Sequence, residues 1–537
     1  MGWKKPRVDA RRPIRKNAKQ RCPFSFSSAN WSIKIVKILS VLIFLATVLK
    51  ISAAPSQWVW LNSSNRLEYK TLPPGDRIMD FSYAGYGSGG VPIPGVPAVI
   101  TVSPSNGDDT TNIQDAIDAV SQMPLTNGFR GAVLLGKGIF YCSGPLVIKA
   151  SGVVLRGYGT GMPGTMIRMT SAPHLGISIE GTSSEENSER IPITDKYAPS
   201  GAMSFHVVDG SSFKPGDAVF ICRPATPAWM AFMGMNDLLH SRKKEQWAGD
   251  TVTRRTVATV SGNTITLEVP LSDSFDSQYL NPPGAWVAHS STSGWIHDVG
   301  VENLRIMSPA QANSLNQKSY QAINLDNISD AWVRNVAIDD AVNSIHTGPN
   351  TSRITIKDVA VKHTVTTAGA AVSADFAVDG TQTLLVHCTD VGNHLFYFAT
   401  LTGAAGPNVL FNCDFSGDGS ISPRERWATG LLFDNCRVNG GSIDLMNRGE
   451  VGSGHGWTSG WSVAWNCVAK NYIIQQPPGA ANWAIGCAGQ QDLAPMPFGK
   501  GPMLPQGIIE PNDQAVDPAS LYLEQLSERL GDKMVMP

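Results

Sequence analysis

A short motif recurs along the second half of the chain, and its spacing limits the fold more than any other feature of the sequence. The motif is an aliphatic residue, a variable one, Asn or Asp, a small apolar residue, a variable one and a second aliphatic residue. Its polar position is occupied in turn by Asn303, Asn335, Asp358, His387, Asn412, Asn435 and Asn466. The intervals of 23 to 32 residues fit one coil of a β-solenoid per copy. We therefore predict stacked coils, with these polar side chains pointing inward at one corner, where they satisfy the backbone of neighbouring coils.

The position after the polar residue is small and apolar in every copy. It is occupied by Leu304, Val336, Val359, Cys388, Cys413, Cys436 and Cys467, and Cys487 follows. Because free cysteine behaves as a small hydrophobic residue, we expect a buried column of thiols and neither disulfides nor catalytic cysteines. We also expect His387, which lies in the polar column, to be structural.

The chain ahead of this repeat has a different period. Residues 107–124 place Ile113, Ala116, Ile117 and Val120 at helical spacing, which predicts one amphipathic helix. Short apolar runs rich in β-formers follow at 132–135, 139–142, 146–148 and 153–155, separated by glycine, serine or lysine. One capping helix is thus expected to lead into many short strands.

The segment GDDTTNIQDAIDA, followed by GAVLLGKGIFYCSGPLVIKASGVVLRGYGTG, resembles the opening of pectate lyase superfamily proteins. With the later coils the resemblance covers about Val96 to Gln490. It implies an all-β fold, a right-handed single-stranded parallel β-helix (the pectin lyase fold) with an N-terminal capping helix, in a secreted carbohydrate-active protein. It does not define the reaction, since that fold serves lyases, glycosidases, epimerases and phage tailspikes.

Three further segments surround or interrupt the predicted β-helix of residues 96–490. Residues 55–95 are expected to be extended. Residues from about 187 to 281 predict longer strands, with a hairpin through Gly262 and Asn263 and a Met-rich short helix or loop, and so an inserted β-rich subdomain. Residues 491–537 predict a Pro-rich segment and an amphipathic helix that covers the open C-terminal end of the solenoid; a partner-binding tail is the alternative.

The net charge of −1 is the sum of two opposed parts. Residues 1–54 hold twelve Lys or Arg and one acid, so the rest holds 43 − 12 = 31 basic and 44 − 1 = 43 acidic residues, a net charge of −12. The apolar run Ile38 to Leu49 is followed by Ser52-Ala53-Ala54, which predicts a signal peptide cleaved near Ala54. An uncleaved membrane anchor is the alternative, although twelve helical residues rise only about 18 Å. We expect a secreted, periplasmic or cell-surface protein with no nucleic-acid partner; its oligomeric state stays open.

The turns ahead of Asn412, Asn435, Asn466 and Cys487 should gather on one side of the solenoid, and they concentrate arginine, histidine and tryptophan. Indoles stack on sugar rings and arginine binds carboxylates, so we predict a polysaccharide groove around Arg426 and His455. The catalytic candidates are His455, Arg426, Arg448 and Tyr397. The substrate-binding candidates are Trp427, Trp457, Trp483, Arg424, His394 and Glu450.

The preferred reaction is β-elimination on a uronate-containing polysaccharide, with His455, Tyr397 or an arginine as base and Arg426 or Arg448 neutralising the carboxylate. A glycoside hydrolase is the alternative, and a non-catalytic glycan-binding or surface-structural β-helix is a third possibility. The hydrolase would use acids among Asp339, Asp340, Asp375, Glu425 and Glu450.

Two motifs of related enzymes are incomplete. Polygalacturonase-type glycosidases place a pair of Asp close before Gly-His-Gly, but Asp339-Asp340 and Gly454-His455-Gly456 are about 115 residues apart here, so that site is not expected. The cofactor is left open. Ca²⁺ is possible at Asp375 and Asp379 or at Asp414 and Asp418, yet no calcium loop is complete. His346 and His363 are expected to be structural.

Overall fold

The structure, a computed structural model, describes residues 53–183, 188–240, 243–244, 246–312, 317–366, 373–493, 503–510 and 513–537. The predicted basic leader and nearly all of the signal sequence lie outside the described residues. Among those that are described, no helix is long and apolar enough to span a membrane.

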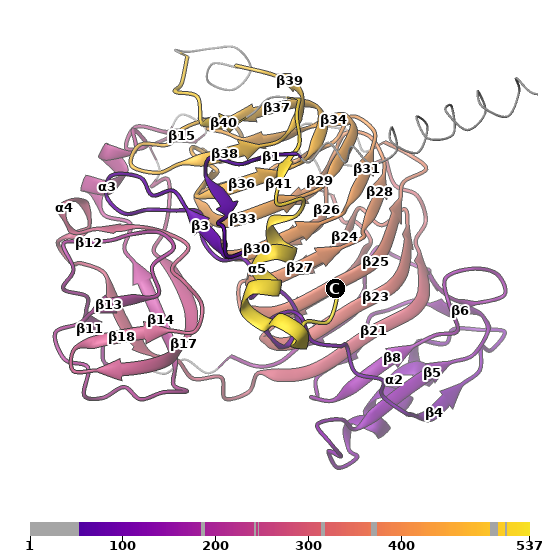
Figure 1. Cartoon of the computed structure of the whole chain (residues 1–537). Helices are drawn as coiled ribbons and strands as arrows, with labels where there is room; N and C mark the ends of the chain where they lie inside the picture. The colour runs from indigo at the N-terminus through magenta and orange to yellow at the C-terminus, as the bar shows by residue number, and fades with distance from the viewer. Residues whose placement is uncertain are drawn as a thin grey trace, which may run out of the picture. The chain divides into compact units, whose positions relative to one another are not determined.

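Stacked parallel strands dominate the molecule (Figure 1). One 27-stranded sheet runs from β4 to β40, and strands of successive coils pair in parallel, as β21 does with β23 and β23 with β25. The strands of the coils are β4 (Ala98–Val102), β5 (Gly131–Leu135), β6 (Gly138–Cys142), β7 (Leu146–Ile148), β8 (Val153–Arg156), β9 (Thr165–Met169), β10 (Leu175–Glu180), β21 (Ile296–Met307), β22 (Gln321–Asp326), β23 (Ile328–Asp339), β24 (Asn343–Thr347), β25 (Thr351–Lys362), β26 (Ser373–Val378), β27 (Thr381–Val386), β28 (Thr389–Val391), β29 (Leu395–Ala399), β30 (Ala405–Phe411), β31 (Asp414–Ser416), β32 (Ser420–Ile421), β33 (Ala428–Asp434), β34 (Arg437–Leu445), β35 (Ser459–Gly460), β36 (Ser462–Trp465), β37 (Val468–Ile474), β38 (Asn482–Ile485), β39 (Ala488–Gln491) and β40 (Ile508–Glu510). The predicted parallel β-helix is confirmed.

The polar residue of the repeat turns a corner of each coil. All seven of these residues have φ between 48° and 58°, in the left-handed region that Asn, Asp and His enter more readily than other side chains. Their side chains are half-buried or exposed, and Asn335 donates across the coils to Asn303 Oδ1 at 2.7 Å. The prediction that they point inward is therefore wrong. Asn, Asp or His recurs at this position of the repeat because these residues adopt the left-handed backbone conformation of the corner.

The thiol column is confirmed. The cysteines at positions 388, 413, 436, 467 and 487 are free and buried, inside the largest apolar core of the protein. Each thiol points toward a carbonyl of the preceding coil, as Cys467 Sγ does toward Phe433 O at 3.1 Å.

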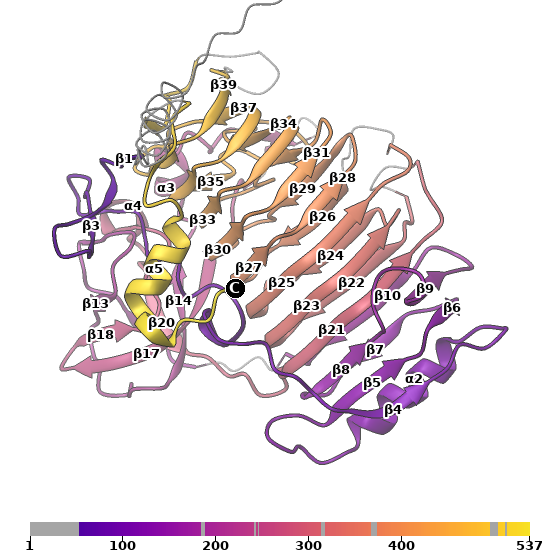
Figure 2. The same cartoon turned by 45° about the vertical axis from the view of Figure 1, so that its right-hand side comes forward.

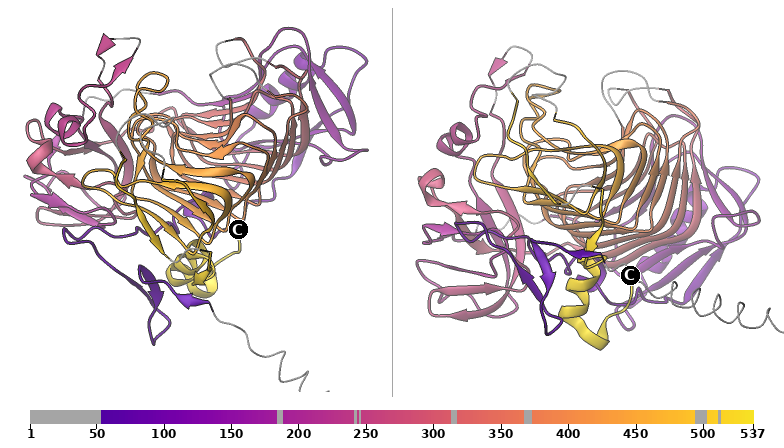
Figure 3. Two further views of the ribbon diagram at one scale, coloured as in Figure 1. Left: turned by 90° about the horizontal axis from the view of Figure 1, so that it is seen from above. Right: turned by 45° about the horizontal axis from the view of Figure 1, so that its top comes forward.

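The insertion forms an antiparallel sheet beside the coils, as the view from above shows (Figure 3). Its six strands have the order β11-β20-β14-β17-β18-β13, and the predicted hairpin at Gly262 is present between β17 and β18. Because β20 pairs with both β11 and β14, the sheet extends past the predicted boundary at 281. The elements of the insertion are β11 (Ile191–Pro192), β12 (Tyr197–Ala198), β13 (Ser204–His206), β14 (Ala218–Arg223), α3 (Pro227–Phe232), β15 (Leu239–His240), β16 (Lys243–Lys244), β17 (Thr251–Ser261), β18 (Thr264–Leu267), β19 (Phe275–Asp276), α4 (Ser277–Leu280) and β20 (Trp286–His289).

Helices cover the coils in two places. The predicted capping helix is α2 (Thr110–Ser121), which buries Ile113, Ala116, Ile117 and Val120. The C-terminal helix α5 (Leu521–Leu530), followed by η3 (Gly531–Lys533), lies along the side of the coils and not across their end (Figure 2). Asp434 of β33 accepts from the Tyr522 amide at 2.7 Å, and the Tyr522 ring packs 5.9 Å from Phe411. The prediction that this helix covers the C-terminal end is wrong, because the apolar face of the helix packs against outward apolar side chains along the side of the coils.

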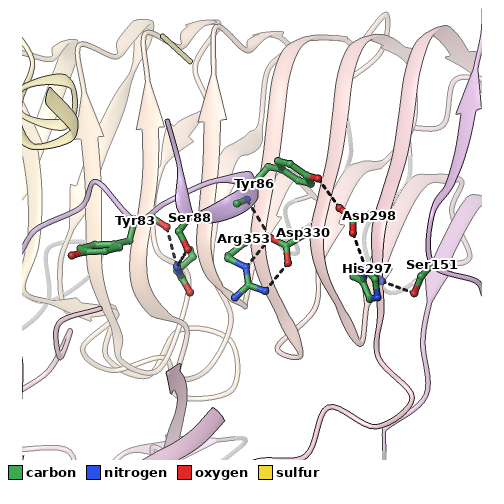
Figure 4. Close-up of polar contacts among 10 residues, drawn as sticks. Tyr83, Tyr86, Ser88, Ser151, His297, Asp298, Asp330 and Arg353 are labelled. Carbon is green, nitrogen blue, oxygen red and sulfur yellow. Dashed lines mark hydrogen bonds and ion pairs between the residues drawn. The ribbon is translucent and has the colours of Figure 1, made fainter. Parts of the chain in front are cut away.

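The segment predicted to be extended follows the same side. It contains β1 (Ala54–Pro55), which pairs with β41 (Val516–Asp517), the hairpin of β2 (Val59–Leu61) and β3 (Leu67–Tyr69), and η1 (Tyr86–Ser88). Around η1 it docks on a second left-handed corner, formed by Asp298, Asp330, Arg353 and Gln382 (Figure 4). Tyr86 donates to Asp298 Oδ1 at 2.6 Å, and Arg353 holds Asp330 at 2.6 and 2.7 Å.

Candidate functional site

One edge of the β-helix brings together several predicted residues and several that the sequence did not indicate. The edge consists of the turns that follow β22, β24, β26, β29 and β32, with the loop 447–457. These turns lie on successive coils: the Leu401 amide donates to Asp379 Oδ1 at 2.5 Å, the Arg424 amide to Thr400 O at 3.1 Å, and the Arg426 amide to His455 O at 3.2 Å. A ligand along this edge would therefore touch all of them in sequence order.

A histidine and an aspartate form the centre of the first half of the edge. His346 on β24 is paired in register with Asn324 on β22. Its Nδ1 lies 2.8 Å from Asn324 Oδ1, and its Nε2 lies 2.8 Å from Asp379 Oδ2. Both ring nitrogens thus lie within hydrogen-bond distance of an oxygen atom.

A second carboxylate lies across a glycine from this pair. The last residues that pair between β22, β24 and β26 lie in register on three successive strands. The residues that come directly after them are Asp326, Gly348 and Asp379, so these also lie one above the other. A Cβ on Gly348 would lie 2.7 Å from Asp326 Oδ1, so any larger residue at position 348 would clash with this oxygen. Asp326 Oδ1 is buried and has no hydrogen-bond partner among the described residues. Two coil spacings put the Cα atoms of Asp326 and Asp379 about 10 Å apart.

A cleft of about 290 Å³ opens between this edge and the insertion, with Asp379, Gly380 and Gly403 on the side of the coils. Arg254 and Trp295 line it from the opposite side, and the guanidinium lies over the indole at 4.6 Å. Burial and the charge of Arg353 lower the pKa of Arg254 to about 10, so it stays a cation at neutral pH. Its Nε is buried and has no partner among the described residues.

The second half of the edge holds the predicted basic group. His455 Nε2 lies 3.1 Å from Glu425 Oε2. Burial, together with the charges of Arg448, Arg424 and Arg426, lowers the pKa of His455 to about 3. The ring is therefore neutral at physiological pH, which makes it a weak base.

The arginines of this half are only half-buried. Arg426 donates to Ser453 O at 2.7 Å and to its hydroxyl at 2.8 Å. Arg448 lies over the ring of Phe396 at 5.3 Å, near Asp444, whose pKa burial raises to about 6. The structure thus brings Arg424, Arg426, Arg448 and His455 together, as the sequence predicted.

Tyr397 does not belong to this edge. Its side chain is fully buried in the core of the coils, where it stacks 5.1 Å from Phe415 and donates to Gly392 O at 3.0 Å. The prediction that it acts as a base is wrong, because no substrate reaches an interior hydroxyl.

Two of the three predicted tryptophans, Trp427 and Trp457, join the insertion to the coils. Trp427, Trp457 and Trp483 are at most 3% exposed, so they offer no face to a sugar. Asp273 of the insertion accepts from Trp427 Nε1 at 2.7 Å and from Trp461 Nε1 at 3.1 Å. Trp457 donates to Met233 O at 3.1 Å, and Trp483 packs against Trp58 and Trp461.

The remaining candidates are scattered. His394 lies at the start of β29, at the opposite end of that strand from the edge, and Glu450 is exposed on the loop 447–457. The acids considered for hydrolysis at the corner after β23 are engaged: Asp339 with Arg305, and Asp340 with Thr364. Asp375 and Asp379 do not share a calcium site, because Asp375 is buried among interior residues and Asp379 faces the edge.

No protein-family model matches the chain, and no curated protein is similar to it. Solved β-helix proteins are similar in fold. The tailspike protein gp49 from Pseudomonas phage LKA1 is 14% identical with a TM-score of 0.37, over 76% of this chain and 72% of that one. The tailspike protein of E. coli bacteriophage HK620 in complex with pentasaccharide is 10% identical with a TM-score of 0.40, over 81% and 62%. The A-module of Azotobacter vinelandii mannuronan C-5 epimerase AlgE4 is 11% identical with a TM-score of 0.29, over 77% and 93%. The likeness concerns the fold alone.

Proposed function

We propose that the protein hydrolyses glycosidic bonds of an acidic extracellular polysaccharide in the cleft beside Asp379. One observation carries this proposal: Asp379, which His346 contacts and which lies two coils from Asp326, lines a cleft whose opposite wall is a guanidinium stacked on an indole. Paired carboxylates are what glycoside hydrolysis requires. An indole and a guanidinium suit a sugar ring and its carboxylate.

The two carboxylates have different surroundings and so different roles. Both oxygens of Asp379 accept hydrogen bonds, from the Leu401 amide and from His346, which fixes the group as a base that orients a water molecule. Asp326 Oδ1 is buried without a partner among the described residues, and we assign this carboxyl the role of general acid. Their separation by two coils is closer to the spacing of inverting enzymes, roughly 6.5–9.5 Å between carboxyl groups, than to the 5 Å or so of retaining ones.

The charge distribution supports an acidic substrate. Residues 55–537 carry a net charge of −12, so an anionic chain needs local positive charge to bind. Arg254 supplies it in the cleft, and Arg424, Arg426 and Arg448 supply it on the coils next along the edge. A polysaccharide lying parallel to the helix axis would meet the catalytic pair first and the arginines next.

This proposal replaces β-elimination as the preferred reaction. The two bases that the sequence suggested are unsuited to it, since Tyr397 lies in the core and the pKa of His455 is lowered to about 3. The arginines keep the binding role that the sequence gave them.

The test is incubation of the full chain with a panel of acidic and neutral polysaccharides, with reducing ends and the absorbance of unsaturated products measured together. We expect new reducing ends on an acidic polysaccharide without unsaturated products. Asp379→Asn and Asp326→Asn should each lower the rate at least about 100-fold, the usual contribution of a general acid or base. Asp414→Asn, the same change at an exposed residue of a coil corner, should leave the rate unchanged. Unsaturated products would contradict hydrolysis, and binding without cleavage would contradict catalysis.

A further inference from the structure

A second group of titratable side chains lies inside the β-helix, away from the edge. His363 follows β25, Asp375 lies on β26 and Asp390 on β28. One ligand atom of each lies within 4.8 Å of the others, the only such group of His, Cys, Asp or Glu among the described residues. His363 is at the surface end of the group, with 6% of its side chain exposed, and Asp375 is fully buried.

Asp390 occupies a position that otherwise belongs to the apolar core. Strand pairing places it between Val361 of β25 and Phe415 of β31, and both of these neighbours are core residues. Its side chain is fully buried, and burial together with the neighbouring Asp375 raises the pKa of this carboxyl well above its usual range. A buried carboxylate is costly unless a proton or a metal cation compensates its charge.

Asp375 is held in an orientation that faces both partners. Its Oδ1 accepts from the Ser344 hydroxyl at 2.5 Å, and its Oδ2 lies 2.8 Å from His363 Nε2. Hydrogen bonds of this kind orient the first ligands of a metal ion in protein sites. Two carboxyl groups and an imidazole thus share one interior space, with their ligand atoms close enough together to bind one ion.

We propose that His363, Asp375 and Asp390 bind a divalent first-row metal ion of the Zn²⁺ type inside the β-helix. One imidazole and two carboxylates are ligands that Zn²⁺ accepts, at distances of roughly 2.0–2.2 Å. Ca²⁺ would need six to eight oxygens, which this interior does not supply. A dication balances the charges of the two aspartates and ties together the coils that carry β25, β26 and β28.

The site is separate from the cleft but shares two strands with it. Ser344 and His346 lie on β24, and Asp375 lies four residues before Asp379 at the end of β26. The metal ion would therefore hold in place the strands that present the proposed catalytic pair. It does not take part in the proposed reaction, so its binding can be tested whether or not the protein cleaves a polysaccharide.

The experiment is titration of the chelator-treated full chain with Zn²⁺ and with Co²⁺. We expect one equivalent of either metal, a tetrahedral Co²⁺ absorption spectrum, and a thermal unfolding midpoint that rises with Zn²⁺ concentration. Asp390→Asn and His363→Gln should each abolish stoichiometric binding, and Asp414→Asn, an exposed position one coil further along, should retain it. If Asp390→Asn does not fold, His363→Gln decides, because this residue sits at the surface end of the group.

Three results would overturn the proposal. The first is the absence of stoichiometric Zn²⁺ or Co²⁺ in the wild-type chain. The second is binding that persists in folded His363→Gln. The third is selective binding of Ca²⁺. A polysaccharide assay on the same samples keeps this question distinct from the proposed function, since loss of metal and loss of cleavage are read separately.

Discussion

Replacing Asp273 by Ala should detach the insertion locally from the coils. The Asp273 carboxylate holds Arg223 Nε at 2.7 Å and the indoles of Trp427 and Trp461 at 2.7 and 3.1 Å, with side chains of Asp273 and Arg223 that are 8% and 2% exposed. The substitution leaves a guanidinium buried without its counter-charge, which costs about 3–5 kcal/mol in comparable cases. Since about 1.4 kcal/mol changes an equilibrium tenfold, the population of the locally open insertion should rise on the order of 10²–10⁴-fold.

Hydrogen exchange measures this opening directly. In Asp273→Ala, amides of β14 and α3 should exchange faster on the order of 10²–10⁴-fold, while those of β21 and β23, far from the contact along the coils, should exchange at the wild-type rate. Asp209→Ala is the matched control, because this aspartate belongs to the same insertion but is exposed. Unchanged exchange in β14 of Asp273→Ala would refute the conclusion that the tryptophans serve to attach the insertion.

Three other predictions concern buried thiols, an acid-sensitive histidine and the basic half of the edge. Burial raises the pKa of Cys142 and Cys222 to about 12, so alkylation of the native chain, read by mass spectrometry, should leave every described cysteine unmodified; native labelling of Cys436 would contradict the thiol column. His455 titrates near pH 3 when folded and near 6.5 when unfolded, so only the unfolded chain takes up this proton between those values and stability falls as the pH falls. His455→Gln should therefore lose less stability than the wild type between pH 7 and pH 4 in denaturant titrations, and equal losses would refute the assignment. Arg424→Ala should raise KM for an acidic polysaccharide and weaken its salt dependence with kcat nearly unchanged; a fall in kcat alone would exclude a binding role.

Much of the fold could be predicted from the sequence, because every copy of the repeat adopts the same conformation in its coil. The thiol column and the capping helix could be predicted, since burial alone determines their residue types. The direction of Asn335 and its equivalents could not, because an inward amide and a left-handed corner favour the same residue. Only the backbone geometry separates these two reasons for Asn.

The candidate site could be predicted in part. Turns at the same offset on successive coils lie on one edge, which is why Arg424, Arg426 and His455 come together. The role of Trp427 could not be derived, since its partner Asp273 is 154 residues away in the sequence and an indole serves an interface as well as a sugar. The pair His346 and Asp379 could not be derived, since the two residues are 33 positions apart and meet only through the stacking of the coils.

A polysaccharide should bind and be cleaved between Asp379 and the insertion. A crystal structure of Asp379→Asn with an oligosaccharide from the cleaved polysaccharide is the decisive measurement. We expect a sugar ring against Trp295 with its carboxylate at Arg254, and further rings that extend along the edge toward Arg424. An oligosaccharide bound elsewhere, such as the cleft that Arg334 and Lys357 line beside the C-terminus, would contradict it.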